Sequence, residues 1–152
     1  MIIYRKAVLN DIKNIQELVR DEVIGGIILP RSDDEVATNI RSYTLAVENE
    51  EIVGLSALHI HAQHLAEIRS IVVKRGLRGK GIGAQIVKKL LEEGAFLGLK
   101  QIFTLTYKKE FFEKLSFKEI PKESLPISKI WADCIKCKHF PICDETALII
   151  NI

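Results

Sequence analysis

Apolar and polar positions follow two different periods along the chain, and the changes of period predict where strands and helices alternate. The first run, Ile2–Lys6, carries β-branched and aromatic residues and precedes Asn10 and Asp11, either of which can cap a helix. Over residues 11–23 the apolar positions recur near helical spacing, with charged residues between them. A strand followed by a helix is therefore predicted, with Gly25–Gly26 ending the helix.

The next segment predicts a short helix followed by an antiparallel hairpin. Ser32 and Glu35 have the spacing of a capping box, so a second helix should begin there. Tyr43–Glu48 and Ile52–Ile60 are rich in strand-forming residues and are separated by a charged, turn-forming stretch. Leu65–Lys74 supplies the next expected strand.

A turn containing four glycines then precedes a long amphipathic helix that Gly98 should end. The expected apolar stripe of this helix is Ile86, Val87, Leu90, Leu91 and Leu97. Gln101–Tyr107 is predicted as a buried strand, Phe111–Leu115 as a short helix and Thr146–Ile150 as the last strand. This order predicts an α+β sandwich with a mixed sheet. No internal repeat or linker divides the chain, so residues 1–152 are expected to form a single domain.

Composition supports one domain and excludes some partners. A chain of 152 residues with 47% hydrophobic residues can bury a sizeable core. The net charge of +2 gives no large field to attract nucleic acid or an anionic membrane. The N-terminus lacks the features of a secretory signal, and no apolar run is long enough to span a bilayer. A cytoplasmic location is therefore expected.

A cluster of soft ligands lies near the C-terminus. Cys134, Cys137, His139 and Cys143 fall within ten positions and could surround zinc tetrahedrally. Three cysteines are an odd number, which argues against a disulfide framework and suits a reducing compartment. A structural zinc, a redox-active pair and ordinary buried or loop thiols all stay open as interpretations.

The glycine turn itself predicts an anion site. Four glycines need little space, so backbone amides can approach a diphosphate at the positive end of the following helix. A triphosphate-binding loop needs Ser or Thr after Gly79-Lys80, where this chain has Gly81. The dinucleotide fingerprint needs a parallel βαβ unit, which the predicted order does not offer. An ordinary surface turn is the alternative.

The run from Arg78 to Gly83 resembles the pyrophosphate signature of the GCN5-related N-acetyltransferase (GNAT) superfamily, and Phe111–Phe117 resembles a downstream segment of it. The resemblance implies a GNAT-type fold, in which helices flank both sides of a mixed central sheet, and acetyl-CoA as cosubstrate. It also implies that a β-strand backbone pairs with the pantetheine arm like an added strand. The cofactor-binding residues that it implies are Ile71, Val72, Val73, Arg78, Gly79, Lys80, Gly81, Ile82, Gly83 and Ala84.

Three further segments, residues 26–32, 67–73 and 124–126, resemble the acetyltransferase domain of amino-acid N-acetyltransferases, the N-acetylglutamate synthases of arginine biosynthesis. This resemblance implies an α-amino acid acceptor, with glutamate first, and places Leu29, Arg31 and Ser70 in the acceptor site. A planar guanidinium suits bidentate binding of a carboxylate, so Arg31 is expected to grip the acceptor.

The chemistry requires a proton acceptor and a proton donor. The acceptor amine must be neutral before it attacks the thioester, and Glu67 matches the family's glutamate as the base. A surface-facing Glu67, with backbone carbonyls and water in its place, is the alternative. Thr106 and Tyr107 are the candidates to protonate the departing thiolate, because Phe112 stands where many members carry a tyrosine acid.

The chain departs from the synthase pattern in ways that widen the choice of acceptor. The family's second arginine near the last strand has no clear counterpart, and a short form without the accompanying kinase domain is expected. Glutamine, aspartate, another small amine or a peptide N-terminus remain alternative acceptors, as does a non-catalytic acetyl-CoA-binding module. His59, His61 and His64 are expected at the hairpin tip before Glu67 as exposed loop residues, with contact to the substrate or to a proton path as the alternative. A homodimer is possible.

Overall fold

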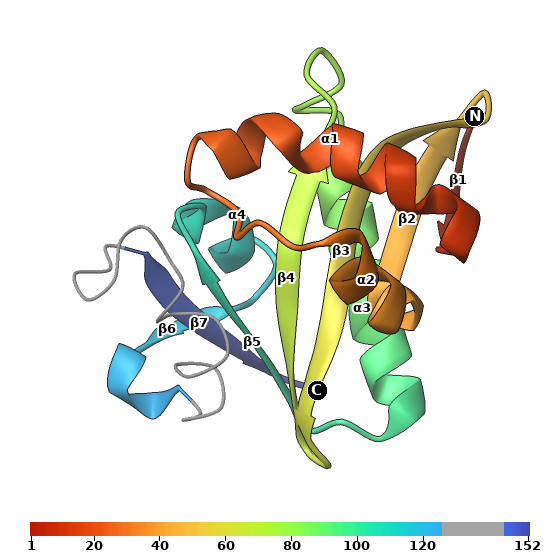
Figure 1. Cartoon of the computed structure of the whole chain (residues 1–152). Coiled ribbons are helices and arrows are strands. Elements are labelled where there is room, and N and C mark those ends of the chain that lie inside the picture. The colour runs from red at the N-terminus through yellow and green to blue at the C-terminus, as the bar shows by residue number, and fades with distance from the viewer. Residues whose placement is uncertain (126–144) are drawn as a thin grey trace.

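One mixed sheet of seven strands runs through the computed structural model, which describes residues 1–125 and 145–152 (Figure 1). The strand order is β1-β2-β3-β4-β5-β7-β6. The strands are β1 (Ile2–Lys6), β2 (Tyr43–Glu48), β3 (Glu51–Ala62), β4 (Leu65–Val73), β5 (Gln101–Thr106), β6 (Lys118–Ile120) and β7 (Thr146–Asn151). β4 and β5 are parallel, and the other neighbouring pairs are antiparallel.

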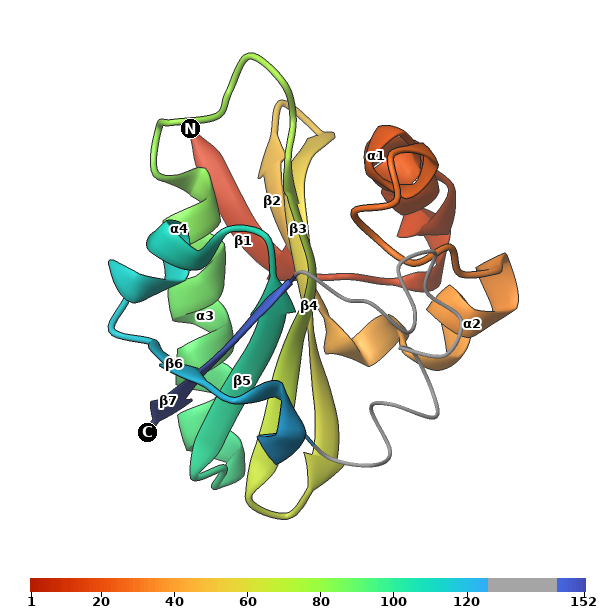
Figure 2. The same cartoon turned by 90° about the vertical axis from the view of Figure 1, so that its left-hand side faces the viewer.

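Helices cover both faces of this sheet (Figure 2). On one face lie α1 (Ile12–Ile24) and α2 (Asp33–Thr38), and on the other lie α3 (Ile82–Leu97) and α4 (Lys109–Glu113). Short 3-10 helices span Leu9–Asp11, Ile40–Ser42 and Lys122–Ser124. The expected α+β fold, with helices on both sides of a mixed sheet, is confirmed. Among the described residues, no helix is both long enough and apolar enough to cross a bilayer.

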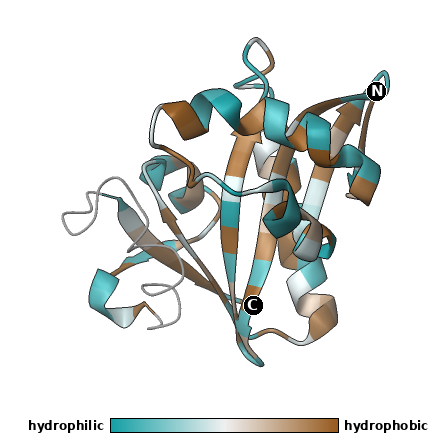
Figure 3. Ribbon diagram, viewed as in Figure 1, coloured by the Kyte–Doolittle hydropathy of each residue, from teal (hydrophilic) through white to brown (hydrophobic). Residues whose placement is uncertain are grey.

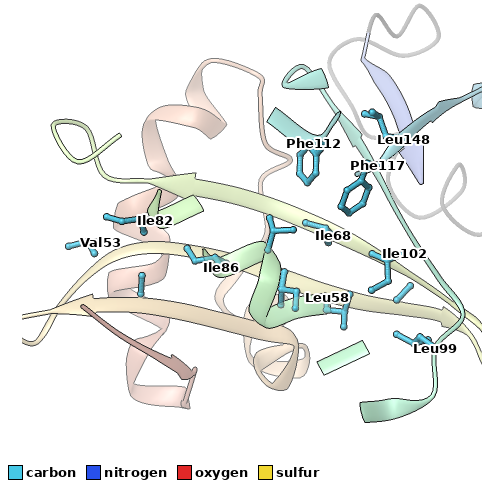
Figure 4. Packing of buried hydrophobic residues seen from close by; sticks show 14 residues of the cluster. Val53, Leu58, Ile68, Ile82, Ile86, Leu99, Ile102, Phe112, Phe117 and Leu148 are labelled. Atoms are coloured by element: carbon cyan, nitrogen blue, oxygen red, sulfur yellow. The ribbon is translucent and has the colours of Figure 1, made fainter. Parts of the chain in front are cut away.

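The apolar faces of strands and helices meet in the interior, as the hydropathy colouring shows (Figure 3). Ile86, Val87 and Leu90 of α3 are fully buried, as their helical spacing predicts. They pack in one cluster with side chains from the sheet and with Phe112 and Phe117 (Figure 4). Leu97 does not follow the prediction: it is half-exposed, because α3 ends there, beyond the edge of the cluster.

Most expected elements are present, with shifts at their ends. The capping box before α2 is in place, since Ser32 Oγ accepts a hydrogen bond from the Glu35 amide and the Glu35 carboxylate accepts one from the Ser32 amide, both 3.1 Å. The short helix predicted over Phe111–Leu115 instead covers Lys109–Glu113, because the chain turns at Ser116 with a positive φ of 75°. Strand β6 has no counterpart among the predicted elements.

Strands β4 and β5 diverge after a short paired stretch (Figure 1). Leu65–Glu67 pairs with Gln101–Phe103, although β4 continues to Val73 and β5 to Thr106. A bulge in β4 opposes two residues to Ser56 of β3, and Ser70 takes a positive φ of 59° there. Ser56 Oγ donates to the Arg69 carbonyl at 2.8 Å and secures the bulge.

Candidate active site

The glycine turn places the N-terminus of α3 beside the end of β4. Gly79 and Gly81 have φ values of 81° and 86°, which side chains other than glycine rarely adopt. The first helical hydrogen bond runs from the Gln85 amide to the Gly81 carbonyl, so the amides of residues 82–84 have no acceptor within the helix. A Cβ built at Gly79 or Gly81 meets no described atom within 4 Å. This positive, open helix end fits the phosphates of a nucleotide.

Gly83 has a different reason to be glycine. A Cβ at this position would lie 3.3 Å from Cζ of Phe111 and 3.6 Å from Cγ2 of Val73. The contact with Phe111 would be tight and the one with Val73 ordinary, so the absence of a side chain lets the first turn of α3 approach α4. The expected cofactor residues 71–73 and 78–84 lie along this end of β4 and the turn that follows it.

Arg78 connects the turn to the end of β4 and to α1. Its Nε donates to the Val73 carbonyl at 2.8 Å, and its Nη2 lies 3.1 Å from Glu22 Oε1. Lys108, which follows β5, belongs to the same charged group. Burial is the main cause that lowers the pKa of Lys108; the charge of Arg78 lowers it further, and the charge of Glu22 acts in the opposite direction. Cationic side chains from both diverging strands therefore gather near the turn.

Glu67 lies in the interior and not on the surface. Its side chain is 2% exposed, so the surface-facing alternative is wrong. Its Oε1 lies 2.9 Å from His61 Nε2 and 3.1 Å from Arg69 Nε. The expectation of exposed loop histidines is also wrong for His59 and His61, which lie in β3. His59 is partly buried and the His61 side chain is 4% exposed, because it packs on Phe103 and Glu67. His64 is exposed at the hairpin tip, as expected.

A small, open hollow with a volume of about 10 Å³ lies on the α1 and α2 face of the sheet. Its lining residues are Arg31, Asn39, Ser42, Tyr43, Ala57, His59, Arg69 and Ser70. Glu67 belongs to this face, because it pairs with His59 across the β3–β4 ladder, as Arg69 pairs with Ala57. The fold thus places Arg31 and Ser70 in the lining of one hollow and puts Glu67 on the same face of the sheet, in contact with Arg69, which also lines it.

Arg31 and Arg69 give the hollow a positive character. Burial raises the pKa of Tyr43, and the charges of Arg31 and Arg69 oppose that rise. Arg69 was not predicted as a site residue, although its position two residues after Glu67 places both on one strand face. Leu29 is partly buried and is not among the described residues that line the hollow.

The two candidate proton donors lie at the end of β5. Thr106 is 8% exposed, and its Oγ1 accepts a hydrogen bond of 2.9 Å from the Lys108 amide. Tyr107 follows the strand and is 37% exposed. Both lie beyond the stretch of β5 that pairs with β4, on the side where the strands diverge.

The predicted zinc ligands Cys134, Cys137, His139 and Cys143 lie outside the described residues. Within residues 1–125 and 145–152, no group of three or more His, Cys, Asp or Glu side chains is arranged to hold a metal ion. The zinc interpretation therefore stays a prediction.

Comparisons with known proteins identify the family. Residues 13–117 match the model of the acetyltransferase (GNAT) family. The chain is 35% identical to an uncharacterised N-acetyltransferase of Chlorobaculum tepidum, over 95% of this chain and 93% of that protein. It is 33% identical to an amino-acid acetyltransferase of Mycobacterium tuberculosis, over 83% of this chain and 72% of that protein.

Structural comparison gives the same fold. N-acetylglutamate synthase of Neisseria gonorrhoeae, solved with coenzyme A and N-acetyl-glutamate, superposes with a TM-score of 0.88 at 21% identity, over 99% of this chain. This chain spans 35% of that larger protein. From the family match, the identity to the named N-acetyltransferases and the shared fold, it follows that the chain belongs to the acetyltransferase (GNAT) family and is an N-acetyltransferase.

Proposed function

We propose that this enzyme transfers the acetyl group of acetyl-CoA to the α-amino group of an amino acid, with glutamate as the acceptor. The product would be N-acetylglutamate, at the first step of arginine biosynthesis. One observation carries the proposal: buried Glu67 lies on the same sheet face as a hollow lined by Arg31, Arg69 and Ser70. The names of the M. tuberculosis and N. gonorrhoeae relatives support an amino-acid acceptor.

Two parts of the chain would bind acetyl-CoA. The amides of residues 79–84 would hold its pyrophosphate at the positive end of α3, with Arg78 and Lys80 adding charge. The backbone of Ile71, Val72 and Val73 would pair with the pantetheine arm, since β4 has already separated from β5 there. Arg78 would then exchange the Val73 carbonyl for a phosphate.

Glu67 would receive the proton that the acceptor ammonium loses before its nitrogen attacks the thioester carbonyl. His61 and Arg69 fix its carboxylate from two sides, which keeps Oε1 in one place on the acceptor face. Thr106 or Tyr107 would protonate the departing thiolate. Thr106 is the stronger candidate. Its Oγ1 accepts a hydrogen bond from the Lys108 backbone amide, which leaves the hydroxyl hydrogen of Thr106 to be donated to another group.

Thiol release from acetyl-CoA tests the proposal against its alternatives. The full chain is incubated with acetyl-CoA and, separately, glutamate, aspartate, glutamine, a polyamine and a short peptide, and free thiol is followed. Release that depends on glutamate is the expected result. Thiol release with only the polyamine or the peptide would show that the acceptor is another kind of amine. Tight acetyl-CoA binding without release would indicate a non-catalytic module.

The pathway is tested separately in cells. Expression of the chain in a bacterium that lacks its own N-acetylglutamate synthase should restore growth without arginine, and the Glu67→Gln variant should not. If neither strain grows without arginine, the result would argue against the arginine pathway but would not change the result of the enzyme assay. We also expect a cytoplasmic enzyme with small-molecule partners, and size-exclusion chromatography with light scattering will show whether it forms the homodimer.

A further inference from the structure

Two buried hydroxyl groups hold consecutive carbonyls of β4. Thr104 Oγ1 of β5 donates to the Ile68 carbonyl at 3.1 Å. From the other side, Ser56 Oγ of β3 donates to the Arg69 carbonyl at 2.8 Å. Thr104 and Ser56 are 3% and 0% exposed, so both hydrogen bonds lie in the interior. The main chain of β4 is therefore fixed from both of its neighbouring strands at one level of the sheet.

Both hydroxyls act where the pairing of β4 is interrupted. The parallel ladder with β5 ends at Glu67 and Phe103, and Thr104 is the first residue beyond it. On the other side of β4, the register with β3 shifts across Ser56. One hydroxyl thus acts at the point where β4 leaves β5, and the other at the point where β4 bulges against β3.

The segment that they hold lies between the groups proposed to serve the two substrates. Glu67, the candidate base, precedes this segment, and residues 71–73, the proposed partners of the pantetheine arm, follow it. Only residues 68–70 lie between them, and Ser70 has a positive φ of 59°. Such a conformation persists in a residue other than glycine when surrounding contacts hold it. The path of residues 68–70 therefore sets the distance between the base and the thioester.

We propose that Ser56 and Thr104 are positioning residues for acetyl transfer. By holding two carbonyls of β4, they keep Glu67 and the acetyl group of acetyl-CoA at the separation that the reaction needs. This inference rests on the proposed function, because it takes from it the roles of Glu67 and of residues 71–73. Both hydroxyls act through the main chain of β4 and not on the substrates themselves.

Thr104→Val and Ser56→Ala each remove a hydroxyl and change the shape of the side chain little. We expect each to lower kcat roughly tenfold, because a small misplacement of reacting groups slows the reaction, and to keep both KM values within about twofold. Thr104→Ser restores the hydroxyl and should recover most of kcat. Thiol release measures these parameters, with the best amine acceptor of the wild-type chain and at a temperature well below the melting point of every variant.

Thr44→Val is the matched control. Thr44 is 4% exposed, and its Oγ1 lies 3.3 Å from Lys6 Nζ. It belongs to β2, which β3 separates from β4. The control therefore removes a buried hydroxyl from the same sheet without touching the interrupted pairing, and its kcat should stay unchanged. Melting temperatures of all variants show whether kcat follows the position of the lost hydroxyl or the lost stability.

A second set of variants separates placement of the base from general damage. In a Glu67→Gln background no base is left to place, so adding Thr104→Val or Ser56→Ala should lower the remaining kcat by less than about twofold. An equal fall in both backgrounds would show a general structural effect and would overturn the inference. An unchanged kcat in both single variants, or a rise in KM for acetyl-CoA alone, would overturn it as well.

Failure of the proposed function looks different. If the wild-type chain releases thiol only with amines other than amino acids, the proposed acceptor is wrong, while the comparisons of variants, made with that amine, still decide the roles of Ser56 and Thr104. If Glu67→Gln keeps the wild-type kcat, the assignment of the base fails and this inference fails with it.

Discussion

Glu67 Oε1 and His61 Nε2 are 2.9 Å apart, in a place where the two side chains are 2% and 4% exposed. A buried carboxylate needs partners, because burying an unpaired charge is costly. His61 of β3 and Arg69 of β4 supply them.

Glu67→Gln preserves the size of the side chain and removes its ability to accept a proton. We expect kcat to fall about a hundredfold to ten-thousandfold, the range of general base catalysis, with little change in KM for the amino acid. Steady-state thiol release measures both parameters. Glu17→Gln, at an exposed position of α1, is the control. An unchanged kcat in Glu67→Gln would remove this residue from the mechanism.

His61 is expected to position Glu67 and not to touch the substrate. His61→Ala takes away one hydrogen-bond partner of the buried carboxylate, so kcat should fall about tenfold. His61→Gln can still donate to Oε1 and should recover most of the activity. If Gln and Ala lower kcat equally, with the same melting temperature, the hydrogen bond is not what His61 contributes.

Arg78→Ala should weaken acetyl-CoA binding and leave the acceptor site intact. Loss of a charge-assisted contact predicts an increase of roughly tenfold in KM for acetyl-CoA. Isothermal calorimetry with coenzyme A measures the same loss directly. Arg75→Ala removes an exposed arginine three positions earlier and serves as the matched control. A rise in KM for the amino acid instead would place Arg78 on the other substrate.

Asp11 contributes stability that depends on pH. Its carboxylate lies 2.8 and 2.9 Å from the two Nη atoms of Arg5, and this hydrogen-bonded pair lowers the pKa of Asp11 against the opposing effect of burial. A lowered folded-state pKa means that the stabilisation is complete above the unfolded-state pKa of about 4 and is lost as pH falls through the folded value.

Asp11→Asn should therefore lower the free energy of unfolding at pH 7 by about 1 kcal/mol, a modest value because Arg5 is 41% exposed. The difference from the wild type should shrink as the pH falls below about 4. Urea unfolding at a series of pH values measures it. A difference that grows toward acid pH would contradict the assignment.

The sequence predicted those helix ends that are fixed by contacts between residues close together in the chain. The capping box of Ser32 and Glu35 and the positive-φ glycine at 98 mark helix ends through contacts within a few residues. β6 escaped prediction because Lys118–Ile120 forms a strand through its pairing with β7, which lies more than twenty residues away in sequence. Short strands of this kind carry no periodic pattern of their own.

The candidate site was predicted in the same uneven way. The glycine turn was recognisable, because both its conformation and the amides proposed to bind phosphate come from consecutive residues. The burial of His61 was not, since it depends on packing against Glu67 and Phe103 from neighbouring strands. Arg69 was missed for a related reason: only the hollow brings it together with Arg31.

Because β4 separates early from β5, the stability of this enzyme should depend on the concentration of coenzyme A. A molecule that lies along the edge of β4 as an extra strand finishes a sheet that the polypeptide leaves open, and it does so only in the native state. By mass action, such a molecule at about a hundred times its Kd protects the fold by about 2.7 kcal/mol. In cells with a high concentration of coenzyme A, a larger share of this protein would thus resist unfolding than in cells with a low concentration.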